Sequence, residues 1–262
     1  MTSFNHYIIS STRSPLRRKG IKENFLTFGI EPRFYEAVMG DSLSREQLQQ
    51  AVKRQGLLTM GEIGCALSHL GIYRNLLTGH EPYVFILEDD ARITADFVKV
   101  LPQLAAFMNQ QSGPATLLLY RVDGLVHPVF SIGQEAHILH SLGGTAAHGY
   151  VLNRQAARNI LAAQTPLRFE IDAWAIYQKL GLISLYSTDR DYVKLDGSTA
   201  AHSTIDQLAK RRELDPSRVR KIKALNIREL YDEQPFSRRC MVQLARLRRH
   251  LEGLYYHKQD RM

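Results

Sequence analysis

The chain has 262 residues, of which 44% are hydrophobic, 9% aromatic and 23% charged. This composition is typical of a globular protein with a large core, and it excludes a disordered chain, a collagen-like repeat and a disulfide scaffold, because two cysteines cannot build a disulfide framework. The net charge of +8 lies in the last fifth of the chain, because residues 1–206 carry 19 basic and 19 acidic residues and residues 207–262 carry 15 and 7.

Strands and helices are expected to alternate along the first 190 residues. The apolar pattern predicts strands at residues 6–10, 34–38, 83–87, 116–120, 150–152 and 182–186. It predicts helices that begin at Pro15 and Ser44 and helices over residues 61–77, 94–110, 155–163 and 171–180. This alternation is typical of an α/β protein with parallel strands. The run from Tyr83 to Leu87 is apolar throughout, as in a strand that is buried on both faces.

A basic segment follows this α/β part, so we expect an α/β domain over residues 1–206 and a largely helical extension over residues 207–262. Four leucines follow helical 3-4-3 spacing among clustered arginines: Leu244, Leu247, Leu251 and Leu254 with Arg238, Arg239, Arg246, Arg248 and Arg249. Such a helix either lies on an anionic membrane surface or packs its leucines on the main domain.

No apolar run reaches the roughly 18 residues that a membrane-spanning helix needs, and the N-terminus lacks a signal-peptide pattern. We therefore expect a cytoplasmic protein with free thiols at Cys65 and Cys240.

The most informative feature is the acidic triplet Glu88-Asp89-Asp90, directly after the buried strand. In open α/β sheets, ligands bind beyond the carboxyl ends of the strands. Glu88 and Asp90 are two residues apart and can converge on Mg²⁺ or Mn²⁺, which prefer oxygen ligands. The alternative is a solvated helix N-terminus, where acidic residues are favourable.

Two motifs in sequence resemble glycosyltransferase family 25, which includes bacterial lipooligosaccharide galactosyltransferases and collagen galactosyltransferases. They are Gly61-Glu62-Ile63-Gly64-Cys65-Ala66-Leu67-Ser68-His69 and Ile86-Leu87-Glu88-Asp89-Asp90-Ala91. Three further segments are similar to that family: Ile9-Ser10-Ser11 with Arg17-Arg18, residues 144–152, and Ile171-Asp172. The resemblance covers residues 5 to about 205.

The resemblance implies a GT-A-like, Rossmann-type domain with the basic helical extension attached. It implies an inverting, metal-dependent enzyme that moves galactose or glucose from a UDP-sugar to a lipooligosaccharide or lipopolysaccharide acceptor. If the sugar is galactose, the enzyme would be a β-galactosyltransferase. The acceptor is lipid-linked, so the basic extension would hold the enzyme peripherally at the inner face of the inner membrane. No nucleic acid is expected as a partner.

The resemblance also implies roles for single residues. Glu88, Asp90 and His202 would hold Mn²⁺ or Mg²⁺, and Asp172 would act as the catalytic base. The donor would contact Ser10, Arg17, Glu62, His69 and Asp89, and the acceptor would contact His148 and Trp174.

Five of these residues have a structural alternative. Arg17 can be a surface arginine, His69 and Trp174 can be core residues, Asp172 can cap a helix, and His148 can fill a turn. Two other function classes stay open at this point, a metal-dependent phosphohydrolase and a basic nucleic-acid-binding protein.

Overall fold

The computed structural model describes residues 4–123, 126–197 and 215–244. Its strands are β1 His6–Ser10, β2 Phe34–Glu36, β3 Tyr83–Glu88, β4 Ala91–Ile93, β5 Ala115–Leu118, β6 Val126–Ile132, β7 Ala136–Ser141, β8 Gly149–Asn153, β9 Ser184–Thr188 and β10 Val193–Leu195. Its helices are α1 Pro15–Thr27, the 3-10 turn Gly40–Ser42, α2 Arg45–Ala51, α3 Met60–Thr78, α4 Ala95–Asn109, α5 Arg154–Ala163, α6 Trp174–Lys179 and α8 Pro216–Asp232.

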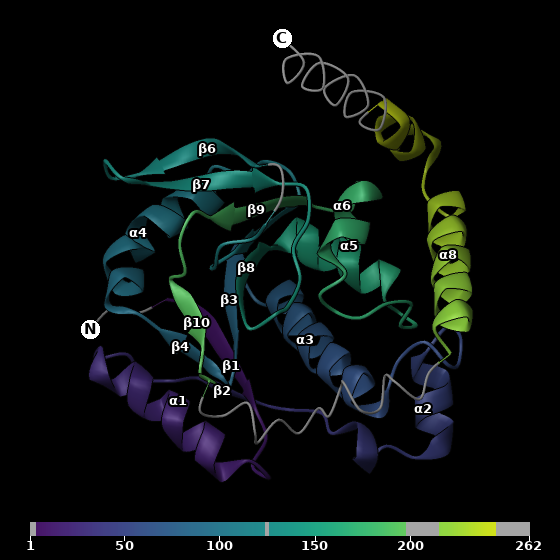
Figure 1. The fold of residues 1–262 in the computed structure, drawn as a ribbon, viewed down its shortest axis with the longest axis horizontal. Coiled ribbons are helices and arrows are strands. Elements are labelled where there is room, and N and C mark those ends of the chain that lie inside the picture. The colour runs from purple at the N-terminus through teal and green to yellow at the C-terminus, as the bar shows by residue number, and fades with distance from the viewer. Residues whose placement is uncertain (1–3, 124–125, 198–214, 245–262) are drawn as a thin grey trace.

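Eight strands form one mixed sheet in the order β2-β1-β3-β8-β5-β9-β7-β6, and β4 pairs with β10 in a separate ribbon (Figure 1). β1, β2 and β3 are parallel, and β5 and β9 are parallel. β8 lies antiparallel between β3 and β5, and β7 is antiparallel to both of its neighbours. Most strands therefore run in one direction, which confirms the α/β class and is consistent with a GT-A-like fold.

The sheet is covered on both faces, which explains the continuous apolar sequence of β3. Val84 and Ile86 point into a core shared with α3, α5 and α6, whereas Phe85 and Leu87 point into a second core shared with α1 and α4. All four side chains are buried. Because successive residues of a strand face opposite sides, a strand between two helical layers must be apolar at every position.

The predicted helices are present, and their ends differ from the predicted ones by at most three residues. Ser44 caps α2, and the capping box with Gln47 is formed. The structure adds the β6–β7 hairpin, which the apolar pattern did not indicate, and the strand at residues 150–152 is antiparallel to its neighbours instead of parallel.

Helix α8, which lies within the predicted basic extension, packs on the α/β part of the chain (Figure 1). Asn226 is completely buried, and its Nδ2 donates to the backbone oxygen of Arg168 at 2.8 Å. Glu229 forms ion pairs with Lys53 at 2.5 Å and Arg54 at 2.6 Å. This part of the extension is therefore docked on the body.

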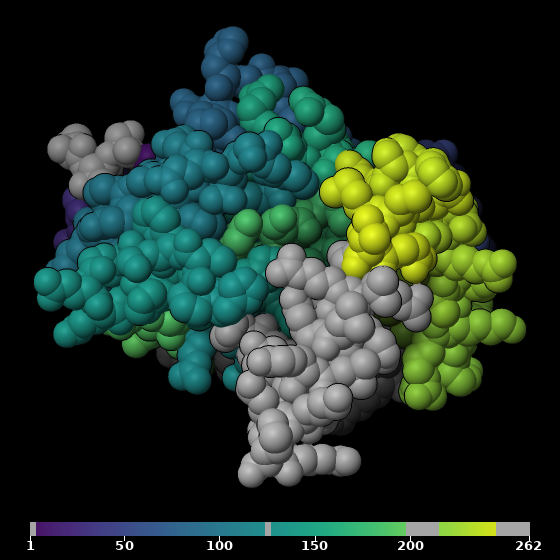
Figure 2. Space-filling view, turned by 90° about the horizontal axis from the view of Figure 1, so that it is seen from above, coloured from purple at the N-terminus to yellow at the C-terminus, as the bar shows by residue number. Residues whose placement is uncertain are grey.

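A second helical segment, residues 236–244, follows α8 and exposes apolar side chains. Phe236, Met241 and Leu244 are 75%, 68% and 65% exposed. In Figure 2 this segment, coloured yellow, lies on the surface of the molecule. His202 lies outside the described residues, and so do the predicted leucines that follow residue 244. None of the described helices combines the length and hydropathy that crossing a membrane requires.

Candidate active site

A pocket lies beyond the carboxyl ends of the parallel strands β1 and β3, next to the first turns of α3. It has a cavity volume of about 80 Å³ and is partly open to solvent. The pocket is lined at the strand ends by Ser10, Glu88 and Asp89 and from α1 by Arg17. From α3 it is lined by Gly61, Cys65 and Ser68. A hollow beyond the carboxyl ends of parallel strands is a typical position for a binding site in α/β proteins.

Close backbone packing shapes the wall of this pocket. A Cβ atom on Gly64 would lie 2.4 Å from the backbone oxygen of Val38, and one on Gly40 would lie 1.8 Å from that of Met60. Only glycine fits at both positions, so the loop after β2 lies directly against the start of α3. The Oγ of Ser68 adds a hydrogen bond from the backbone N–H of Val38, at 2.8 Å.

The acidic triplet is partly neutralised by a buried arginine. Nη2 of Arg17 lies 2.9 Å from Oδ1 of Asp89 and 2.5 Å from Oδ2 of Asp90. Oγ of Ser10 donates to Oδ2 of Asp89 at 3.0 Å, because the register of β1 on β3 places these residues side by side. Burial raises the pKa of Asp89, and burial together with the charge of Glu88 raises the pKa of Asp90 to about 6.

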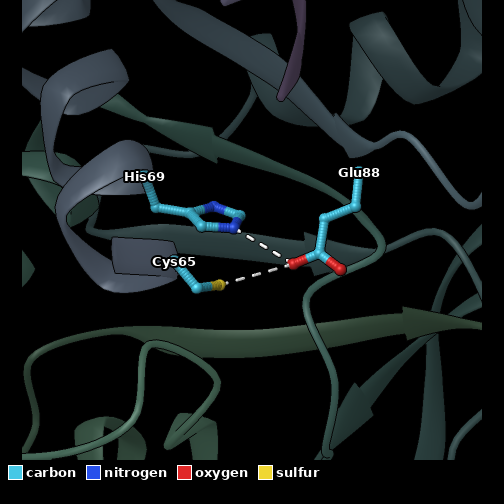
Figure 3. A group of neighbouring side chains, drawn as sticks. All are labelled: Cys65, His69 and Glu88. Atoms are coloured by element: carbon cyan, nitrogen blue, oxygen red, sulfur yellow. Dashed lines mark hydrogen bonds and ion pairs between the residues drawn. The ribbon is translucent and has the colours of Figure 1, made fainter. Parts of the chain in front are cut away.

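Glu88 is held from the opposite side by α3 (Figure 3). Its Oε1 lies 3.3 Å from Nε2 of His69 and accepts a weak hydrogen bond from Sγ of Cys65 at 3.7 Å. Nδ1 of His69 lies 2.7 Å from the hydroxyl of Tyr150, which lies 2.7 Å from that of Tyr73. Burial opposes ionisation of Glu88, but the hydrogen bond and charge of His69 prevail and lower its pKa.

Asp172 lies between α5 and α6 and contacts the loop that precedes β8. Oδ2 of Asp172 accepts the backbone N–H of Ala146 at 2.8 Å, and burial raises the pKa of Asp172. The N-cap of α6 is Ala173, so Asp172 does not cap that helix. Ala146 has φ of 70°, a left-handed conformation that is costly for a residue with a side chain.

Three hydrogen bonds hold that conformation, and one of them is donated by the Ala146 N–H to Asp172. The backbone oxygen of Ala146 accepts the indole N–H of Trp174 at 2.7 Å and the hydroxyl of Tyr120 at 2.7 Å. Strained backbone that is fixed by its surroundings is typical of functional sites. The ring of Tyr120 stacks on His148 with centroids 4.0 Å apart, and burial lowers the pKa of His148. The backbone oxygen of His148 accepts the N–H of Glu88 at 3.1 Å.

The structure brings together Ser10, Arg17, Glu88, Asp89 and Asp90 as the sequence predicts. His148 lies next to the triplet, because its backbone oxygen accepts the Glu88 N–H. Asp172 is near enough for the charge of Glu88 to contribute, after burial, to its raised pKa.

Three predicted contacts need correction. Trp174 is completely buried against Tyr150 and Tyr177, so its expected stacking on an acceptor sugar is wrong. His69 is also completely buried and orients Glu88 instead of contacting a donor. Glu62 caps α3, where it accepts the backbone N–H of Thr59 at 2.8 Å, and it is not among the residues that line the pocket.

The sequence prediction missed Cys65, Tyr150 and Arg92. The spacing of Cys65 and His69, four residues apart on a helix, places them on one face and was the available signal. Arg92 lies beside the triplet, where its guanidinium donates to the backbone oxygen of Asp89 at 3.2 Å and pairs with Asp196 at 2.5 Å. No local pattern distinguishes Arg92 from a surface arginine.

Comparison with known proteins identifies one family. The family model described as "Glycosyltransferase family 25 (LPS biosynthesis protein)" matches residues 4–175. The chain is 31% identical over 184 residues to a "Glycosyltransferase 25 family member" of Drosophila melanogaster, covering 60% of this chain and 28% of that protein.

Two other relatives differ in what their names say. The chain is 27% identical over 168 residues to the "Lacto-N-neotetraose biosynthesis glycosyltransferase LgtE" of Neisseria meningitidis serogroup B, covering 60% of this chain and 59% of that protein. It is 30% identical over 179 residues to a "Probable inactive glycosyltransferase 25 family member 3" of Bos taurus, covering 62% of this chain and 29% of that protein. The chain thus matches between about a quarter and three fifths of the length of these relatives.

Proposed function

Because this chain belongs to glycosyltransferase family 25, we propose that it transfers a hexose from a UDP-sugar to a sugar of a lipooligosaccharide or lipopolysaccharide acceptor, with inversion at the anomeric carbon. Galactose is the preferred donor sugar and glucose the alternative. The observation that carries the proposal is the acidic triplet with its buried Arg17, at the mouth of a pocket formed by strand ends. The family description names LPS biosynthesis, and the name of the LgtE relative adds that it builds an oligosaccharide, lacto-N-neotetraose; together they support a sugar acceptor of this class.

The proposed donor complex includes Mn²⁺ or Mg²⁺. Oδ1 of Asp90 is buried and has no hydrogen-bond partner among the described residues, and the neighbouring donors are carboxylate oxygens, which both ions prefer. Asp90 and Glu88 would hold the ion, and His202 is a third proposed ligand. The ion would neutralise the diphosphate leaving group. Arg17, released from Asp90, would form a bidentate contact with that diphosphate.

Asp172 is the proposed base. Its pKa is raised by burial, which brings it closer to the working pH and so favours general-base catalysis. It takes the proton of the acceptor hydroxyl while that oxygen bonds to the anomeric carbon and the bond to the UDP oxygen breaks. The Ala146 N–H fixes the Asp172 carboxylate, and His148, beside Glu88, is the proposed acceptor contact.

We further propose that the basic extension holds the enzyme on an anionic membrane surface at the cytoplasmic face. Residues 236–244 combine the exposed Phe236, Met241 and Leu244 with Arg238 and Arg239. Apolar side chains flanked by arginines suit the interface of an anionic bilayer. Replacing Phe236, Met241 and Leu244 by serine in the full chain should reduce binding to phosphatidylglycerol vesicles, and unchanged binding would refute this role.

The enzymatic proposal is tested by donor hydrolysis. Purified protein is incubated with UDP-galactose or UDP-glucose, with Mn²⁺ or with chelator. We expect Mn²⁺-dependent release of UDP from one donor and its loss in Asp90→Asn. The matched control is Asp96→Asn, because Asp96 is an exposed carboxylate at the start of α4 that pairs with Lys99. Equal turnover with chelator, or unchanged turnover in Asp90→Asn, would contradict the metal role.

A further inference from the structure

Cys65, His69 and Glu88 form a cluster of three potential metal ligands of mixed chemistry (Figure 3). One ligand atom from each residue lies within 4.8 Å of the other two. Cys65 and His69 stand one turn apart on α3 and point at the same carboxylate at the end of β3. Thiolate, imidazole and carboxylate together select a borderline or soft divalent cation over Mg²⁺.

We propose that Sγ of Cys65, Nε2 of His69 and Oε1 of Glu88 form a binding site for Zn²⁺ or a cation of the same class. This site differs from the oxygen-donor site proposed for Mn²⁺ or Mg²⁺, and it shares only Glu88 with it.

The spacing of the ligand atoms fits a tetrahedral ion. With Zn–S near 2.3 Å and Zn–N and Zn–O near 2.0 Å, tetrahedral angles place sulfur about 3.5 Å from oxygen and nitrogen about 3.3 Å from oxygen. The observed separations are 3.7 Å between Sγ and Oε1 and 3.3 Å between Nε2 and Oε1. Two of the three edges thus match a tetrahedral site, and the third, between Sγ and Nε2, lies within 4.8 Å, where about 3.5 Å is needed.

The hydrogen bonds behind His69 support the same assignment. A histidine that binds metal through one nitrogen usually donates its other N–H to a fixed partner, which sets the tautomer. Nδ1 of His69 lies 2.7 Å from the hydroxyl of Tyr150, and this hydroxyl lies 2.7 Å from that of Tyr73. In the proposed site Nδ1 donates its proton to this chain of hydroxyls, and Nε2 exchanges its contact with Glu88 for the cation.

The cluster is also accessible, because Cys65 and Glu88 both line the pocket. An ion held by three protein ligands keeps its fourth position open toward this pocket, where water or a donor oxygen can bind. The thiol proton of Cys65 passes to solvent when the sulfur–metal bond forms. The resulting charges of thiolate, carboxylate and divalent ion cancel, which favours a partly buried site.

One consequence rests on the proposed function: an ion at this site occupies Glu88 and should inhibit transfer that depends on Mn²⁺. The binding proposal itself does not depend on that activity, because it is tested without donor.

The experiment uses the tag-free full chain and Co²⁺ as a spectroscopic substitute for Zn²⁺. The chain has only two cysteines, so Cys240→Ser leaves Cys65 as the sole thiol. We expect one equivalent of Co²⁺ to give a thiolate-to-cobalt charge-transfer absorption in Cys240→Ser that equals the wild type and that Zn²⁺ abolishes. Cys65→Ser should lack the absorption, and Tyr150→Phe should weaken Zn²⁺ binding by about 10–100-fold.

Absence of the charge-transfer absorption in Cys240→Ser would overturn the proposal, whatever the folding of the other variants. Persistence of the absorption in Cys65→Ser would overturn it as well. Hydrolysis of UDP-galactose with Mn²⁺, measured on the same samples, separates the two proposals. Hydrolysis without the cobalt signal refutes this site alone, whereas the cobalt signal without hydrolysis supports this site and counts against the donor chemistry.

Discussion

Replacing Arg17 by methionine removes the cation that pairs with Asp89 and Asp90, and this change is expected to destabilise the fold. The guanidinium lies 2.9 Å from Asp89 and 2.5 Å from Asp90, and all three side chains are largely buried. At an effective dielectric constant of about 20, each contact is worth roughly 6 kcal/mol before desolvation. Most of that attraction offsets desolvation, and removing one partner of a buried ion pair costs about 3–5 kcal/mol. We therefore expect Arg17→Met to lose about 3–5 kcal/mol of unfolding free energy near neutral pH.

The loss should depend on pH in a defined direction. The pKa of Asp90 is raised from 3.8 to about 6 in the folded protein. A carboxyl with a raised pKa stabilises the fold fully below pH 3.8, and this contribution is lost as the pH rises through about 6. Without Arg17 the pKa of Asp90 rises further, so the penalty should be largest above pH 6 and smaller near pH 5, where Asp90 is mostly protonated in both proteins.

The assay is urea unfolding at about pH 7.5 and about pH 5. The matched control is Arg18→Met, because Arg18 pairs with Glu36 at 2.8 Å on the surface and should lose at most about 1 kcal/mol. A loss below about 1 kcal/mol for Arg17→Met at pH 7.5, or equal losses at both pH values, would refute the buried-ion-pair reasoning.

Three further predictions follow from the site and from α8. Asp172→Asn should lower the rate of transfer by about 10²–10⁴-fold with an unchanged urea midpoint, and near-normal transfer would exclude Asp172 as the base. Ala146→Gly should raise the unfolding free energy by up to about 1 kcal/mol because it relieves the φ of 70°, and a loss in urea unfolding would contradict the strain. Asn226→Ala should lose about 1–3 kcal/mol, since it leaves the buried Arg168 carbonyl without its donor, and an unchanged thermal midpoint would contradict the docking of α8.

The sequence predicts the α/β frame because that frame is encoded locally. The apolar run of β3 and the capping box of α2 need no long-range information. The direction of β8 is different, because it depends on which strands flank it, and those are β3 and β5 from distant parts of the chain. The β6–β7 hairpin was missed because Pro128 and the polar residues around it weaken the strand pattern.

The sequence predicts where the site lies in the fold, but it does not predict which side chains contact one another there. The rule that ligands bind beyond strand ends places the triplet correctly. The pairing of Arg17 with Asp90 spans 73 residues, and no spacing rule reaches that far. Glu62, His69 and Trp174 were assigned to substrates because their residue types suit such contacts. The direction of each side chain, toward a helix end or into the core, appears only when the layers are assembled.

The position of β8 also affects how the chain folds. This strand fills the centre of the sheet, between β3 and β5, although it follows both in the sequence. During synthesis, β3 and β5 therefore emerge with unpaired edges that remain open until Asn153 is available. Open edges favour pairing with other chains, and non-local pairing slows folding. A ribosome-bound fragment that ends before β8 should consequently be the stage most prone to aggregation.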